Sequence, residues 1–192
     1  MNVGLTLKSI RLRNRLLNRR AVALLVYVAD DLSIASGRPL TVSRVPLGPL
    51  QPGTALVYEG LGLLLVPPRE VGSAIIWRVE LWQGEEARHQ VERWLSDLVC
   101  SITLSDPLVR SLAAAPPDLP GAELALGKIA GRMGHALSGA GDERLEVWPG
   151  SLRCSQVEDL TGSVFRQVSY HAEIELGILV TEGEGPQAAD VE

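Results

Sequence analysis

The side chains best suited to metal binding or thiol chemistry are few and widely spaced. The histidines His89, His135 and His171 lie 46 and 36 residues apart, and Cys100 and Cys154 lie 54 apart. Zinc ligands are normally recognised in pairs only a few residues apart, and none of these residues has that spacing. The sequence therefore predicts no metal site and no metal-ligating residue.

Two adjacent carboxylates, Asp30 and Asp31, directly follow a long apolar run. Oxygen ligands at a loop suit a hard cation such as Ca²⁺. The pair lacks the Asp-x-Asp-x-Asp density of a specific calcium loop, so a capped turn is the favoured interpretation. A calcium ion near Asp30 and Asp31 stays open as the alternative.

Nucleophilic catalysis and cofactor binding have no local motif in the chain. The sequence contains no Gly-x-Ser-x-Gly elbow, Ser-x-x-Lys, phosphate loop or dinucleotide fingerprint. Cys100 falls on the apolar side of a predicted helix end, where a buried, inert thiol is expected, and Cys154 has no histidine near it in sequence. We therefore predict no catalytic residue, no cofactor-binding residue and no cofactor, and the protein is not expected to be an enzyme.

Composition limits the class of protein. The chain has 192 residues, 46% of them hydrophobic, which is typical of one globular domain and excludes a fully disordered chain. Its net charge of −5 argues against a dedicated nucleic-acid binder. Residues 1–20 hold six basic side chains and no acid, so they carry +6 and the remaining 172 residues carry −11.

Arginine outnumbers lysine sixteen to two. Arginine makes planar, multiply hydrogen-bonded contacts, so this bias suits ion pairs and interfaces, although codon usage in a GC-rich genome is the simpler explanation.

Targeting signals are weak. The longest apolar run, 21–29, is far shorter than the roughly 20 residues that a membrane-spanning helix needs. A basic stretch followed by an apolar run is typical of a signal peptide. Here, however, two aspartates follow the run directly, and there is no small-x-small cleavage site. A cytoplasmic protein is predicted, and two unpaired cysteines suit a reducing compartment.

Alternating apolar residues predict strands before and after a central block. Residues 3–12 alternate with a one-residue phase slip, which indicates a strand with a bulge and a basic outer face bearing Arg11, Arg13 and Arg15. Residues 21–29 read as a central strand buried on both faces. Further strands are predicted at 40–45, 73–82, 144–148 and within 162–180. The runs 54–58 and 61–66 predict either a tight hairpin or one kinked strand, and Pro67-Pro68 should end the second run.

The central block, 84–141, has helical periodicity. We predict a helix over 87–102, a short helix opened by Asp106-Pro107, and a glycine-rich helix over 122–137. In the last of these, Gly127 and Gly131, and Ala130 and Gly134, form a small-x-x-x-small surface that permits close packing. Packing against the protein's own sheet is favoured, with a partner subunit or a membrane surface as alternatives.

The order of strands, helices and strands predicts an antiparallel β-sandwich, an all-β or α+β fold, with a helical insertion between strands. Residues 1–83 and 142–180 form the predicted sandwich, 84–141 the insertion of two or three helices, and 181–192 an acidic, disordered tail. The architecture is similar to C2-like β-sandwich domains by analogy only, and no residues are carried over.

These features favour a non-enzymatic structural or interaction protein. It would self-assemble or bind a protein partner through the basic strand face and the glycine-rich helix, and the +6 start could meet the acidic tail of a neighbouring copy. A peripheral membrane or pore-related module is the alternative, and a hydrolase with a site assembled from scattered residues is the second. No specific nucleic acid and no small-molecule substrate are predicted.

Overall fold

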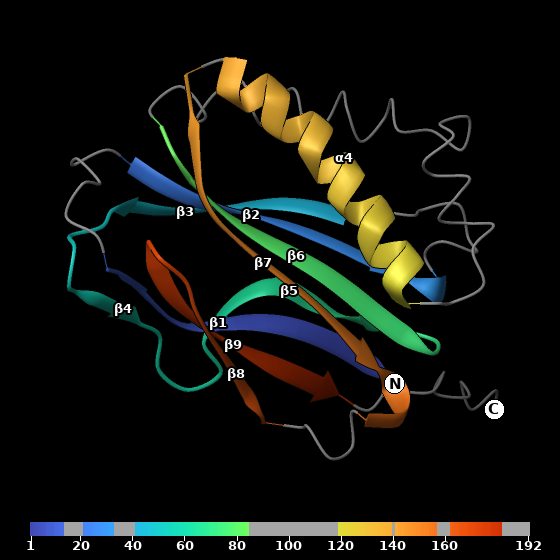
Figure 1. Ribbon diagram of the computed structural model, residues 1–192. Coiled ribbons are helices and arrows are strands. Elements are labelled where there is room, and N and C mark those ends of the chain that lie inside the picture. Colours follow the sequence, from blue (N-terminus) through green and yellow to red (C-terminus); the bar gives the residue numbers. More distant parts are fainter. Residues whose placement is uncertain (14–20, 33–40, 85–118, 140, 157–161, 182–192) are drawn as a thin grey trace, which may run out of the picture.

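The computed structural model describes residues 1–13, 21–32, 41–84, 119–139, 141–156 and 162–181. Their nine strands form two antiparallel sheets (Figure 1). Sheet A contains β1 (Asn2–Leu12), β4 (Ala55–Val57), β5 (Leu63–Glu70), β8 (Val164–Val168) and β9 (Ala172–Thr181). Sheet B contains β2 (Ala21–Asp30), β3 (Thr41–Pro49), β6 (Ala74–Gln83) and β7 (Glu143–Arg153) in the order β3-β2-β6-β7.

The structure confirms the predicted antiparallel sandwich with a helix between strands. The helix α4 (Leu119–Gly139) lies in the chain between β6 and β7 and packs across the outer face of sheet B (Figure 1). A short 3₁₀ turn, η1 (Cys154–Gln156), follows β7. The helices predicted over 87–102 and after Asp106, and the tail after Thr181, lie outside the described residues. The division into sandwich and insertion stays a prediction.

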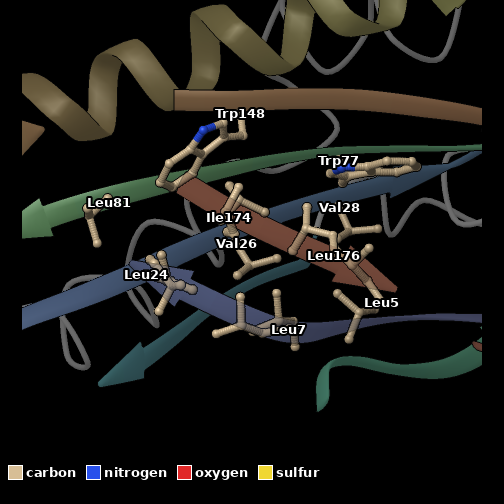
Figure 2. Packing of buried hydrophobic residues seen from close by; sticks show 14 of the residues in the cluster. Leu5, Leu7, Leu24, Val26, Val28, Trp77, Leu81, Trp148, Ile174 and Leu176 are labelled. Atoms are coloured by element: carbon tan, nitrogen blue, oxygen red, sulfur yellow. The ribbon is translucent and has the colours of Figure 1, made fainter. Parts of the chain in front are cut away.

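The core lies between the two sheets, where apolar side chains from both inner faces meet (Figure 2). Leu5 and Leu7 of β1 point toward Leu24 and Val26 of β2, as alternation along a strand requires. Each fully buried leucine contributes about 1.5–3 kcal/mol relative to an exposed one, so this layer dominates the stability of the sandwich.

The predicted bulge in the first strand is confirmed. The register between β1 and β9 shifts between Leu7 and Ser9, which leaves Lys8 as the extra residue. Without that extra residue the apolar positions on either side of the slip would face opposite ways. The bulge keeps both Leu7 and Ile10 fully buried in the core.

The two runs around Glu59 and Gly60 do not form a hairpin. Both strands pair with the same edge of β1, β4 with Ser9–Arg11 and β5 with Asn2–Leu7, so they act as one interrupted strand. Gly62 ends the interruption with φ of 86°, and a Cβ there would lie 2.6 Å from the Leu7 carbonyl oxygen, so only glycine fits.

The prediction that Pro67-Pro68 ends a strand is wrong. β5 continues to Glu70 and pairs only with β1 among the described strands, so its prolines occupy an edge where no ladder donor is needed. The predicted strands at 40–45 and 144–148 are also longer than expected, since β3 reaches Pro49 and β7 reaches Arg153.

Candidate functional site

A fully buried carboxylate, Glu80, lies on the helix-facing side of sheet B. It accepts hydrogen bonds from Arg78 Nε at 2.7 Å and from Trp82 Nε1 at 2.9 Å. The Tyr27 hydroxyl and Arg144 Nη1 also donate to the Glu80 carboxylate, each at 3.4 Å. Alternation along β6 places Arg78, Glu80 and Trp82 on one face, so the strand supplies most of this cluster by itself.

Burial decides the protonation state of the phenol in this cluster. Desolvation raises the pKa of Tyr27 far above its ordinary value, and the negative charge of Glu80 adds to the effect although Arg78 opposes it. Tyr27 is therefore a neutral donor toward a carboxylate acceptor. Both side chains are fully buried, so the cluster acts by holding Trp82 and Arg144 in place.

A cleft of about 420 Å³ adjoins this cluster at the C-terminal half of α4. Helix, strand and loop residues line it, and they include both acidic and basic side chains. The lining residues are Trp82, Gly131, Gly134, His135, Ser138, Asp142, Glu143 and Arg144. The Arg144 guanidinium lies 6.0 Å from the centre of the Trp82 ring, within the range of a cation–π contact. Trp82 and Arg144 thus belong both to the Glu80 cluster and to the wall of the cleft.

A bulge in β7 brings Arg144 to this position. Glu146 pairs with Leu81 and Arg144 pairs with Trp82, which leaves Leu145 as the extra residue. Leu145 is buried in the core between the sheets, whereas Arg144 turns toward α4. A bulge commonly re-aims a side chain in this way. Simple alternation along the sequence would place Leu145, not Arg144, opposite Trp82. Arg144 and the cleft were therefore not identified from the sequence.

The outer face of sheet A carries charges of both signs. Arg11 and Ser9 of β1 pair in register with Glu173 and Glu175 of β9. Ser9 Oγ donates to Glu175 at 2.7 Å, and Arg166 of β8 forms an ion pair with Glu173. The strand predicted to be basic therefore lies on a face of mixed charge. Arg15 lies outside the described residues.

Exposed apolar side chains flank this ladder of charges. Val57 and Leu64 lie on the β4–β5 edge, and Val164 and Val168 on β8 are 50% and 55% exposed. The exposed apolar side chains thus lie along both edges of this face, with the charged ladder between them.

The two aspartates predicted to cap a turn have different roles. Asp30 is fully buried and lies 2.7 Å from Arg69. Asp31 accepts hydrogen bonds from the Ser73 amide at 2.6 Å, the Ser73 hydroxyl at 2.7 Å and the Gly72 amide at 3.0 Å. Asp31 therefore caps the turn between β5 and β6, whereas the turn predicted at Asp30-Asp31 continues into residues 33–40, which lie outside the described residues, and stays a prediction. Partial burial alone would raise the pKa of Asp31, yet these hydrogen bonds outweigh it and hold the pKa below its ordinary value.

The structure does not bring the two described histidines together. His135 lines the cleft on α4, whereas His171 precedes β9 in sheet A, where its amide donates to Glu146 at 2.6 Å. Across the described ranges, no three His, Cys, Asp or Glu side chains are placed to hold a metal ion. His89 lies outside those ranges.

The described cysteine has the character of an unreactive thiol. Cys154 begins η1, and its amide donates to the Ser73 carbonyl at 2.8 Å. Burial raises the pKa of the Cys154 thiol, and the nearby carboxylate of Asp31 raises it further, so little thiolate forms at neutral pH. Cys100 lies outside the described residues.

The glycine-rich helix packs on its own sheet, as favoured from the sequence. Its inward positions are buried against β6 and β7: Leu126, Ile129, Ala130, Met133 and Leu137. Gly134 lies under Trp82, where a Cβ would come 3.5 Å from the ring, whereas a Cβ on Gly131 would meet nothing within 4 Å. The glycines therefore divide between a packing contact and the open cleft.

Comparisons with protein-family models, with curated proteins and with solved structures found no match. Among the described helices, none is long and apolar enough to span a bilayer.

Proposed function

We propose that the protein is a non-enzymatic interaction protein that self-associates through the outer face of sheet A. The observation that carries this proposal is the pattern on that face, where exposed valines and leucine frame a ladder of alternating charges. The outer face of sheet B is covered by α4 (Figure 1), whereas no described element covers the outer face of sheet A. Among the described elements, sheet A therefore offers the larger uncovered face.

Charge complementarity favours a second copy of the chain as the partner. Arginines on β1 and β8 alternate across the face with glutamates on β9. Two copies related by a two-fold axis can set the arginines of one against the glutamates of the other, because a two-fold interface pairs each patch with itself.

The acidic closing segment supports assembly between copies. Residues 182–192 hold four acids and no base, and they follow Thr181, which pairs with Asn2. The basic end of β1 at Arg11 lies about 30 Å away along the strand. Eleven residues span at most about 36–40 Å, so within one chain only the last acids could reach it. A neighbouring copy whose Thr181 lies nearer to this basic end could bring more of its acids to it.

The glycine-rich helix contributes less to this proposal than the sheet does. Its apolar side is already buried on sheet B, so association through it would use mainly polar residues and the exposed Leu124. A membrane surface is the alternative partner, and co-sedimentation with liposomes of anionic lipid separates it from self-association.

Native mass in solution tests the proposal. We expect an oligomer at low salt that weakens at high salt, because the charge ladder is exposed to screening. Placing Asp at both Val164 and Val168 should give a monomer, because it introduces like charges into an apolar contact. The matched control is Leu124→Asp on α4, also an exposed apolar position, which should leave the mass unchanged.

Two results would contradict the proposal. One is a strict monomer at low salt, and the other is a valine double variant that associates like the unmodified protein. Removing residues 182–192 tests the role of the acidic segment separately, and unchanged association would eliminate that role while leaving the sheet interface.

A further inference from the structure

We propose that the open edge of β8 pairs antiparallel with β8 of a second copy of this chain, so that the two A sheets join into one continuous sheet. This contact lies in the plane of sheet A, at the margin formed by β8 (Figure 1). The proposed function uses the outer face of the same sheet. The edge therefore adds a second contact between copies, and either contact can fail without the other.

The strands at the sheet margins differ in their protection against pairing with another chain. Among the described strands, the margins are formed by β3 and β7 in sheet B and by β4, β5 and β8 in sheet A. Proline has no amide hydrogen, so it prevents an edge from completing a ladder with a further strand. β8 (VFRQV) contains no proline, and β4, which also lacks proline, has only three residues. The prolines of the other margin strands are Pro46 and Pro49 in β3, Pro67 and Pro68 in β5, and Pro149 in β7. β8 is therefore the least protected edge.

The backbone groups of β8 alternate between β9 and the open edge. Ser163 and Ser169, on either side of the strand, hydrogen-bond to β9 at 3.4 and 2.9 Å. Every second residue of an antiparallel pair bonds to its partner strand, so the intervening odd-numbered residues also bond to β9. The residues whose amide and carbonyl groups point to the open edge are Val164, Arg166 and Val168.

The side chains at these outward positions favour a contact. Val164 and Val168 are β-branched and at least half exposed, which suits them to pack across neighbouring strands. Arg166 carries the only charge in β8, and a charge on an edge normally discourages pairing. Its ion pair with Glu173 of β9 offsets that charge within its own sheet.

Two-fold symmetry restricts the register between two copies of β8. Only residues with outward backbone groups can bond to one another. A register centred on Arg166 would set two guanidinium groups opposite each other, which is unfavourable. A register centred on Gln167 instead sets Arg166 of each copy opposite Val168 of the other. The strand is thus complementary to itself, and this register gives about four backbone hydrogen bonds between the copies.

Native mass at high salt separates the edge contact from the proposed face contact. Salt screens the charge ladder of the face, whereas backbone hydrogen bonds between uncharged groups depend little on salt. We therefore expect a dimer to persist at high salt. A strict monomer at high salt would overturn the edge contact, even where association at low salt supports the face. A dimer of the same mass at low and high salt would support the edge contact and not the face.

Val168→Pro tests the edge while an apolar side chain stays on the face. It removes one outward amide from each copy, and proline is tolerated on an edge where the N–H faces solvent, so the fold should be kept. We expect the dissociation constant of the high-salt dimer to rise at least about tenfold, because hydrogen bonds between the copies are lost. Val168→Thr keeps both the amide and the shape and should associate like the unmodified protein. A dimer that survives Val168→Pro unchanged would overturn the proposal.

Amide hydrogen exchange followed by NMR gives a second readout that needs no variant. When the protein is concentrated at high salt, the amides of Arg166 and Val168 should exchange at least about tenfold more slowly than in dilute protein. The amides of Phe165 and Gln167 already bond to β9 and should change little. A dimer in which Arg166 and Val168 exchange as fast as in the monomer would overturn the edge pairing.

Discussion

Replacing Gly150 with alanine tests the packing between the sheets. Gly150 of β7 pairs in register with Trp77 of β6, whose ring lies in the core (Figure 2). A Cβ at residue 150 would come 2.6 Å from Trp77 Nε1 and closer still to Cε2 and Cζ2. The tryptophan ring therefore occupies the space that any other side chain would need.

The cost of this substitution follows from the geometry. Ordinary contact between such atoms is about 3.5–4.0 Å, so the ring would have to move by about 1 Å. Trp77 is nearly buried and packs edge-on against Phe165, with ring centres 6.4 Å apart, which leaves little room to move. Overpacking of this kind costs about 1–3 kcal/mol, partly offset by about 0.5–1 kcal/mol from removing glycine's conformational freedom. We expect Gly150→Ala to lower the free energy of unfolding by about 1–2 kcal/mol.

Urea unfolding followed by tryptophan fluorescence measures the effect. Gly131→Ala is the matched control and should raise stability by about 0.5–1 kcal/mol, because this helical glycine has free space around it. In a Trp77→Phe background the cost of Gly150→Ala should fall by about 1 kcal/mol, since the smaller ring leaves room for the methyl group. The reasoning fails if Gly150→Ala lies within about 0.5 kcal/mol of the unmodified protein or if the two substitutions are additive.

Three further substitutions, with Glu143→Gln as a control, test the electrostatics. Glu80→Gln should lower the free energy of unfolding by about 2 kcal/mol. This is less than the roughly 3–5 kcal/mol lost when a fully buried ion pair is broken, because Arg78 and Arg144 keep contact with water. The exposed Glu143 is the control, and Glu143→Gln should change the free energy of unfolding little. Tyr27 has a raised pKa in the folded state, so its contribution to stability is present below the unfolded-state pKa of about 10 and is lost progressively as the pH rises above it. Tyr27→Phe should therefore flatten the fall in melting temperature at alkaline pH. Asp31 has a lowered pKa, so its contribution is present above the unfolded value of about 3.9 and is lost as pH falls below it; Asp31→Asn should destabilise the protein at pH 7 and have a smaller effect at acidic pH.

The strands were predictable where one face is apolar and the other polar. β9 follows this pattern, and Ile174 and Leu176 on its apolar face are buried. The edge strands were harder to predict, because they contain prolines and glycines, which normally indicate loops. β5 retains Pro67 within the strand, since an edge needs no amide donor at that position.

The cleft depends on contacts that no local pattern contains. Its walls come from β6, α4 and β7, and the turn of Arg144 toward α4 depends on the bulge at Leu145. The one available signal was Glu80 within an apolar strand, because a buried carboxylate needs donors nearby. Similarly, the basic character of β1 was predictable, but its neutralisation by Glu173 depends on pairing with a distant strand.

The pairing of β1 with β9 has a consequence for synthesis on the ribosome. Thr6 donates to the carbonyl of Gly177, a residue 171 positions further along the chain. At a translation rate of about 5–20 residues per second, β1 waits roughly 10–30 s for this partner. During that interval β4 and β5 can cover one edge of β1, but the other edge stays open to strands of neighbouring nascent chains. Slower translation between β1 and β9 should therefore increase aggregation and chaperone dependence, whereas a circular permutant that synthesises β9 immediately before β1 should reduce both.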